Sequence, residues 1–173
     1  ALTLGDAPPA SLWHTLYATG YDEICVLESS LREFAPTQVA ASLATHLKGF
    51  DLILTGRQAP MGDTASVPYL LAEALGIPVV PEVEDAHAQE GERLAVDCAQ
   101  DEGRLRMEID FPALLAVGNS PVASLRAAPL RAKLQAAKRE TACVSCPLPP
   151  KPPPHLRRAV ASQGRAFLHA ADP

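Results

Sequence analysis

The hydrophobic pattern alternates short, continuous apolar runs with longer segments in which apolar residues recur every three or four positions. Apolar runs lie at residues 1–4, 24–27, 52–55 and 78–80, and segments with helical spacing lie between them, at 12–17, 36–47 and 70–75. Short runs of this kind are typical of strands buried on both faces. Their alternation with helices indicates an α/β fold. We therefore predict a three-layer, nucleotide-binding-like fold built on a parallel sheet.

The pattern changes after Val83, where a polar segment, 84–92, precedes two runs of alternating apolar and polar residues. Leu94 and Val96 alternate in the first run. The second run has the same pattern at Leu105, Met107 and Ile109. This predicts a small, half-exposed β-hairpin with its turn near Glu102-Gly103. Ala113–Val117 is continuously apolar again, and we expect it to rejoin the main sheet.

The C-terminal part is predicted to form an extended arm. Six prolines occur between residues 143 and 154, at positions 147, 149, 150, 152, 153 and 154, too many for a helix or a central strand. Leu156, Val160, Phe167 and Leu168 indicate a short C-terminal helix that docks on another surface. We therefore divide the chain into an α/β domain, 1–142, and a proline-rich arm with its helix, 143–173.

Composition narrows the functional classes. A chain of 173 residues that is 47% hydrophobic can bury the core of one domain. No apolar run approaches the roughly 20 residues that cross a bilayer, and the first residues lack the pattern of a signal peptide. The formal net charge of −5 argues against a general nucleic-acid binder. We expect a cytoplasmic protein with no membrane span and no nucleic-acid partner.

Motifs for metal binding or catalysis are weak. Cys143 and Cys146 have the spacing of redox or zinc pairs, but tetrahedral zinc needs about four ligands and only His155 follows nearby. The pair also lies at the start of the proline-rich segment, so we interpret both as incidental thiols in a loop. The chain has no serine nucleophile elbow, no HExxH motif and no complete Walker loop. The basic residues between 123 and 139 are interpreted as a solvated face. No catalytic residue is predicted.

The first candidate site is the polar loop that follows the apolar run 52–55. Ligands of parallel α/β sheets bind beyond the carboxyl ends of strands. Gly56 and Gly62 let the backbone approach a ligand closely, and the next helix presents unpaired N–H groups at its N-terminus. This combination suits a phosphate group.

The same loop resembles a known family. Gly56-Arg57-Gln58-Ala59, then Gly62-Asp63-Thr64 and Val67, resemble the nucleotide loop of electron-transfer flavoprotein β subunits. Four further motifs resemble elements of that family and extend the match to Arg139: Asp101-Glu102-Gly103, Phe111-Pro112-Ala113-Leu114-Leu115, Asn119-x-Pro121 and Leu130-Arg131-Ala132-Lys133.

The resemblance implies a site and partners. The site residues would be Gly56, Arg57, Gln58, Gly62, Asp63, Thr64 and Val67, holding the phosphate of AMP, or of a second FAD in bifurcating members. The protein would pair with an α subunit whose FAD carries electrons from dehydrogenases to an acceptor, as an electron-carrier subunit rather than a catalyst. The alternative is a nucleotide-binding regulatory α/β module without electron transfer.

Two departures from the family qualify these expectations. Met61, Ser66 and Pro68 replace an acid, a glutamine and a glycine of the family loop. Since proline has no N–H to donate, we expect AMP to bind more weakly than in relatives that keep the glycine. Family members also carry a strand and a helix ahead of the position that matches Ala1. The chain is then a fragment, which is the simplest interpretation, or the protein lacks this strand, or another chain supplies it.

Overall fold

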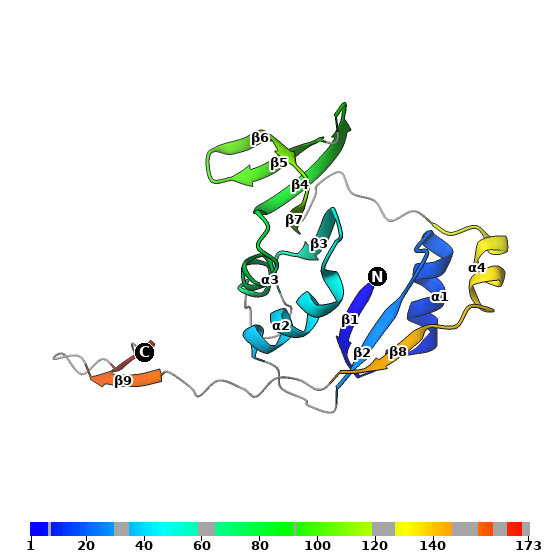
Figure 1. Cartoon of the computed structure of the whole chain (residues 1–173), viewed down its shortest axis with the longest axis horizontal. Helices are drawn as coiled ribbons and strands as arrows, with labels where there is room; N and C mark the ends of the chain where they lie inside the picture. Colours follow the sequence, from blue (N-terminus) through cyan, green and yellow to red (C-terminus); the bar gives the residue numbers. More distant parts are fainter. Residues whose placement is uncertain are drawn as a thin grey trace.

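The described residues form two larger β-sheets flanked by helices, and a third, two-stranded sheet near the C-terminus (Figure 1). The computed structural model describes residues 1–6, 8–29, 35–58, 65–91, 93–118 and 127–146, and the backbone of 156–160 and 166–170. None of the helices in these ranges is long and apolar enough to cross a membrane.

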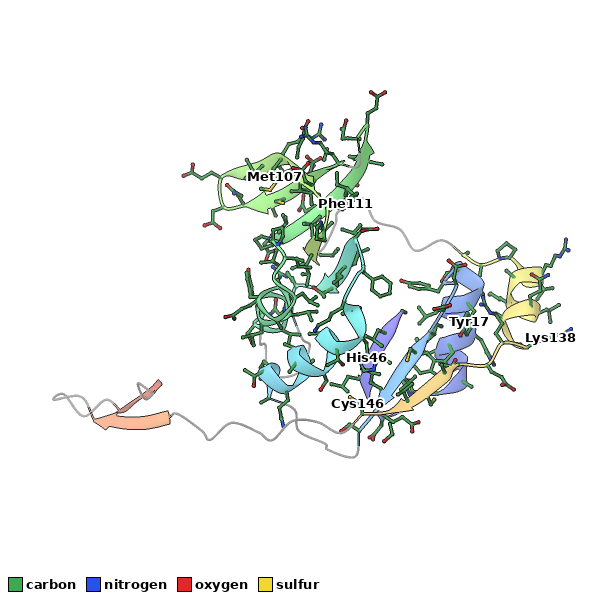
Figure 2. The ribbon with its side chains drawn as sticks, in the orientation of Figure 1. Tyr17, His46, Met107, Phe111, Lys138 and Cys146 are labelled. Atoms are coloured by element: carbon green, nitrogen blue, oxygen red, sulfur yellow. The ribbon has the colours of Figure 1, made fainter. Side chains whose placement is uncertain are left out.

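The first sheet has three parallel strands in the order β1-β2-β8, with bounds Leu2–Gly5, Cys25–Glu28 and Ala142–Ser145. Helices α1 (Ala10–Thr19) and α4 (Leu130–Ala136) pack against each other beside this sheet. Their shared core contains Trp13, Tyr17, Ala18, Ile24, Val26 and Ala136. The Arg139 guanidinium lies over the ring of Tyr17, 4.2 Å from the ring centroid, and so links the segment after α4 to α1. Tyr17 is labelled on α1 in Figure 2.

The second sheet has five strands in the order β3-β7-β4-β5-β6. Their bounds are Leu52–Gly56, Ala113–Val117, Val79–Gln89, Arg93–Gln100 and Gly103–Asp110. The β3–β7 and β7–β4 pairs are parallel, whereas β4, β5 and β6 are antiparallel. Helices α2 (Pro36–Leu47) and α3 (Val67–Leu75) pack on each other and share a core with this sheet.

Local sequence explains where the helices begin and end. Pro36 opens α2, where its missing N–H is not needed. The Gln38 side chain accepts a hydrogen bond from the Ala35 N–H at 3.0 Å, which satisfies a donor at that end. Gly20 and Gly76 follow α1 and α3 in left-handed conformations, with φ of 111° and 68°. Glycine adopts this conformation without the steric cost that a side chain adds.

The predicted α/β fold with a mostly parallel sheet is confirmed, as are the hairpin and the return of Ala113–Val117 to the main sheet between β3 and β4. The interpretation of 84–92 as a separate polar segment was incomplete. Residues 84–89 belong to β4, which continues far past the apolar run and pairs with β5. This part of β4 has an exposed face, so its polar residues do not prevent pairing.

The expected C-terminal helix is wrong. The backbone there forms two antiparallel strands, β9 (Leu156–Val160) and β10 (Ala166–Ala170). Gly164 between the apolar positions disfavours a continuous helix. The placement of Cys143 in a loop is also wrong, because this residue lies in β8 and is paired with Val26 of β2. Strand β8 therefore crosses the predicted boundary between residues 142 and 143.

Helix α2 buries a different stripe from the one its apolar spacing predicts. Val39, Leu43 and Leu47 were expected to form its core face, yet all three are only half-buried. The fully buried positions of α2 are Gln38, Ala40, Ser42 and Ala44. The larger side chains of this helix are therefore incompletely covered, and Leu43 and Leu47 line a cavity between the two sheets.

Candidate functional site

The candidate loop begins at the carboxyl end of β3, where three strands of the second sheet come together. Gly56 ends β3, and the N–H of the next residue, Arg57, donates to the Val117 carbonyl at the end of β7 (3.0 Å). On the other side of β7, the Gly118 N–H donates to the Val83 carbonyl of β4 (2.9 Å). This is the edge at which ligands of parallel sheets bind.

Arg57 and Glu82 form an ion pair at this edge. The Arg57 Nη1 donates to both carboxylate oxygens of Glu82, at 3.0 Å to Oε1 and 2.8 Å to Oε2. Glu82 lies where the register between β4 and β7 shifts, and it has a φ of 53°. It is the one non-glycine residue with positive φ in the described part of the chain. Such a conformation costs on the order of 1–3 kcal/mol, so the fold holds this carboxylate in an unfavourable backbone position against Arg57.

The residue after β7 leaves room for the pair. A Cβ built on Gly118 would lie 3.3 Å from Glu82 Oε2 and 3.8 Å from Arg57 Cδ. The first distance is tighter than ordinary van der Waals contact, so a larger residue here would push against the carboxylate. The absence of a side chain at Gly118 therefore spares the Glu82 carboxylate this close contact.

Helix α3 begins shortly after the candidate loop in the sequence, and its N-terminus has fewer hydrogen-bond donors than an ordinary helix start. Ser66 is the N-cap residue, and its side chain makes no capping hydrogen bond. Val67 begins the helix, and the buried Pro68 follows it. Since proline lacks an N–H, the first turn presents one donor fewer to an anion. This turn contains no acidic residue, so no carboxylate offsets the partial positive charge that the helix dipole places at its N-terminus.

The structure describes four of the seven predicted residues. Gly56, Arg57 and Gln58 lie at the carboxyl end of β3, and Val67 begins α3. Gly62, Asp63 and Thr64 lie outside the described residues. Whether these seven residues bind a nucleotide stays a prediction.

Glu82 and Gly118 were missed by the sequence interpretation. An acid between two apolar segments looks like ordinary surface charge, so Glu82 gave no signal. Gly118 did give one, because a glycine directly after a buried strand marks the edge at which ligands bind.

Other reactive groups form no second site among the described residues. That part of the chain holds no group of three or more histidine, cysteine or acidic residues placed to bind a metal. All four cysteines are free. Burial raises the pKa of the Cys98 thiol, and desolvation followed by the nearby Glu28 raises the pKa of Cys143. Raised thiol pKa values reduce the thiolate, which is the reactive form.

The hairpin carries a second arginine–carboxylate pair of a different kind. Arg106 on β6 donates from Nε and Nη2 to the two carboxylate oxygens of Asp97 on β5, at 2.7 and 2.6 Å. Its hydrogen bonds hold the pKa of Asp97 below the usual range. The two residues face each other directly in the β5–β6 register, so the pair joins neighbouring strands and lies apart from the candidate loop.

Comparison with known proteins gives one consistent family. The family model described as "Electron transfer flavoprotein domain" matches residues 1–144. The chain is 31% identical over 143 residues to the "Putative electron transfer flavoprotein subunit YgcR" of Escherichia coli (strain K12), covering 81% of this chain and 55% of that protein.

Two further relatives agree with this match. The chain is 32% identical over 120 residues to the "Caffeyl-CoA reductase-Etf complex subunit CarD" of Acetobacterium woodii, covering 66% of this chain and 45% of the relative. It is 37% identical over 84 residues to the "Electron transfer flavoprotein subunit beta" of Megasphaera elsdenii, covering 47% and 31%. The chain thus spans about half the length, or less, of the curated relatives that it matches.

Proposed function

The chain belongs to the electron transfer flavoprotein family, and we propose that it acts as the β-like subunit of a cytoplasmic electron-transfer complex. In this proposal it pairs with an FAD-bearing α subunit, and the complex passes electrons from dehydrogenases to an acceptor. The observation that carries the proposal is the family match over residues 1–144, which extends from β1 into β8. FAD supplies the redox chemistry when bound, and this chain supplies a docking surface and a nucleotide site.

Co-expression with an α subunit encoded beside it in the source genome tests this function. We expect the two chains to co-purify as a yellow complex with the absorbance of flavin, because the α subunit brings FAD. The α subunit expressed alone is the control for flavin that does not depend on this chain. A colourless homodimer that binds ATP, with no co-purifying α subunit, would contradict the proposal and support a regulatory nucleotide-binding module instead.

We also propose that AMP binds weakly at the edge formed by Gly56, Arg57, Gln58 and Val67, together with Gly62, Asp63 and Thr64. The backbone arrangement suits a phosphate, because a strand end with a glycine leads toward a helix N-terminus. The charge arrangement opposes it, since Glu82 already neutralises Arg57. An incoming phosphate must therefore displace this carboxylate or approach beside it.

Replacing Glu82 with glutamine is expected to tighten AMP binding about tenfold, which corresponds to about 1.4 kcal/mol. The variant removes the carboxylate that repels phosphate and releases Arg57 to donate to it. The two side chains of the pair are 42% and 41% exposed, so losing their attraction should cost at most about 1 kcal/mol of stability. Calorimetric titration with AMP measures the effect.

Asp97→Asn is the matched control, because it neutralises the acid of an arginine pair on the hairpin and should leave AMP affinity unchanged. Pro68→Gly should tighten binding independently, since it restores an N–H in the first turn of α3. If Glu82→Gln leaves the affinity as it was, Arg57 is not a phosphate ligand. If Pro68→Gly leaves the affinity for AMP unchanged, the N-terminus of α3 does not bind the phosphate.

A further inference from the structure

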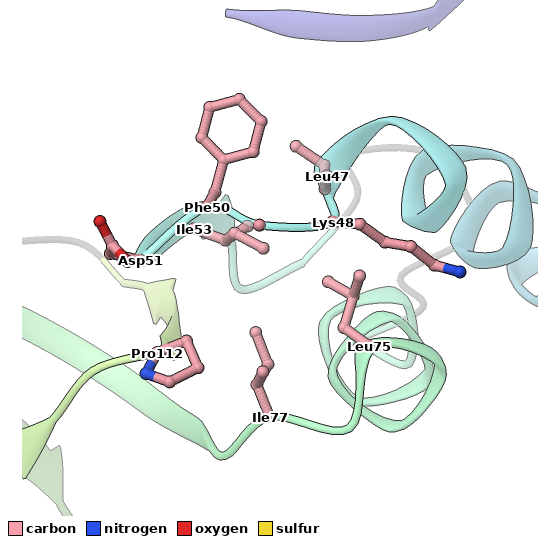
Figure 3. Close-up of a pocket in the computed structure, with 9 residues that line it drawn as sticks. Leu47, Lys48, Phe50, Asp51, Ile53, Leu75, Ile77 and Pro112 are labelled. Atoms are coloured by element: carbon pink, nitrogen blue, oxygen red, sulfur yellow. The ribbon is translucent and has the colours of Figure 1, made fainter.

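Strand β6 of the hairpin carries a free backbone edge. It lies last in the order β3-β7-β4-β5-β6, so among the described strands only β5 pairs with it. Figure 1 shows β6 on the outer side of β5. Its carboxyl end is fixed, because Phe111 packs against the core of the second sheet and Pro112 lines a pocket with Ile77 and Leu75 (Figure 3). The free edge therefore belongs to an anchored strand.

The turn of the hairpin shows which backbone groups this edge presents. Two residues, 101 and 102, separate β5 from β6, so Gln100 and Gly103 form the hydrogen-bonded pair that closes the turn. Bonded and non-bonded pairs alternate along an antiparallel ladder. The odd-numbered residues of β6 therefore bond to β5. The N–H and C=O groups on the free edge belong to the even-numbered residues, namely Arg104, Arg106, Glu108 and Asp110.

The charged side chains of these four residues change sign at the centre of β6. Arg104 and Arg106 precede Met107, and Glu108 and Asp110 follow it. All four side chains lie on one face of the sheet, and each is at least 60% exposed. Charged side chains on an edge strand usually prevent edge-to-edge pairing. An edge that is basic in one half and acidic in the other instead attracts a reversed copy of itself.

We propose that β6 pairs antiparallel with β6 of a second copy of this chain, about a two-fold axis at Met107. This register sets Arg106 opposite Glu108 of the second copy, and it sets the two residues with free backbone groups opposite each other. In the same way, Arg104 lies opposite Asp110 of the second copy. Sliding the strands by two residues would set Arg106 against Arg106, or Glu108 against Glu108. Like charges directly opposite each other are destabilising, so the charges select one register.

The ion pairs within the hairpin extend into rows of alternating charge across the proposed interface. Asp97 on β5 accepts hydrogen bonds from Arg106 at 2.7 and 2.6 Å, and Glu108 of the second copy places an acid on the other side of this arginine. Arg93 on β5 donates to Asp110 at 2.9 Å, and the first arginine of β6 in the second copy lies beyond this acid. Each new neighbour has the opposite sign, so the pairing adds attraction without breaking these ion pairs.

The opposite face of β6 is apolar and is covered further by the same pairing. Leu105 is 39% exposed, and Met107 and Ile109 are half-buried against the core of the second sheet. In the proposed register, Leu105 lies opposite Ile109 of the second copy, and the two Met107 side chains meet at the axis. Apolar cross-strand pairs stabilise a sheet. The pairing involves the hairpin alone and is independent of the proposed function.

Met107→Cys in the 173-residue chain tests the register. The two copies of residue 107 form a pair without mutual hydrogen bonds, with Cα atoms about 4.5 Å apart, a separation that a disulfide can bridge. We expect a disulfide-linked dimer after mild oxidation, seen by electrophoresis without reductant. Ile109→Cys is the matched control, because its two copies would lie roughly 14 Å apart along the strands and should not cross-link. The parent chain, whose four cysteines are free, gives the background.

Sedimentation velocity of two charge variants tests the complementarity. Arg104→Glu with Arg106→Glu makes β6 entirely acidic, and Glu108→Arg with Asp110→Arg makes it entirely basic. Each variant alone is expected to self-associate at least about tenfold more weakly than the parent chain, because like charges then face each other. An equimolar mixture should form dimers again, since every opposed pair then joins opposite charges.

Arg131→Glu with Lys133→Glu is the control for net charge, because both residues are exposed on α4, and this variant should self-associate as the parent chain does. The proposal is overturned if the parent chain stays monomeric at every concentration at which it is soluble, or if the acidic variant self-associates as tightly as the parent. It is also overturned if Ile109→Cys cross-links as readily as Met107→Cys. Should circular dichroism show that a charge variant is unfolded, Met107→Cys decides, because it keeps every charge of β6.

Discussion

Replacing Leu115 with alanine is expected to lower the free energy of unfolding by about 2–5 kcal/mol, whereas Leu54→Ala should cost less than about 0.5 kcal/mol. The two residues are partners in the β3–β7 register, so they have the same residue type and lie on neighbouring strands. Leu115 is 1% exposed and belongs to the core of the second sheet, but Leu54 is 63% exposed at the open edge. Truncation leaves a cavity at the first position and removes little buried area at the second.

Urea denaturation followed by far-ultraviolet circular dichroism measures both values. Since Leu54 and Leu115 differ in burial rather than chemistry, each variant serves as the control for the other. Equal losses in the two variants would show that Leu54 is covered in solution, which would contradict an open edge at β3.

Ending the chain after Cys146 is expected to leave the α/β core folded while weakening the complex with the α subunit at least about tenfold. The truncated chain keeps all of β8 and the hydrogen bond from the Cys146 N–H to the Glu28 carbonyl (2.9 Å). It loses the β9–β10 pair, which Figure 1 draws away from both sheets. A lone two-stranded hairpin is at best marginally stable in water, so we expect these strands to gain their stability by packing against a partner chain.

The affinity of intact and truncated chains for the α subunit can be compared by calorimetry. Circular dichroism of the truncated chain supplies the control for folding. A truncated chain that is folded and binds the α subunit as tightly as the intact one would show that the C-terminal segment takes no part in assembly. A truncated chain that unfolds would contradict the expectation that the core is complete by Cys146.

The sequence predicts the elements whose cause is local. Buried parallel strands such as Ala113–Val117 appear as apolar runs, and Gly20 and Gly76 mark helix ends because their left-handed conformations favour glycine. The polar half of β4 could not be predicted in this way, since it is a strand only because β5 lies beside it. The β9–β10 pair was missed because its short apolar runs were interpreted as helical spacing, and periodicity alone does not separate a short helix from a local hairpin.

The position of the candidate loop in the fold was predictable, whereas the charges around it were not. A polar loop after a buried strand identifies the carboxyl edge of a parallel sheet, and Gly56 and Arg57 lie at that edge. The pairing of Arg57 with Glu82 depends on a register shift in β4 and a contact between residues 25 positions apart. Neither the register shift nor this contact can be predicted from the local spacing of apolar residues. The charge at the site is therefore a property of the folded sheet.

Among the described helices and strands, helix α2 makes the main contact between the two larger sheets. It contacts β1 of the first sheet and packs on α3 of the second, while no strand pairing joins the two sheets in the described residues. Two parts of a protein that share few contacts can unfold as separate cooperative units. Trp13, the single tryptophan of the chain, lies in the core beside the first sheet, so its emission follows the melting of that half alone. We therefore expect fluorescence and circular dichroism to give different unfolding midpoints for this chain.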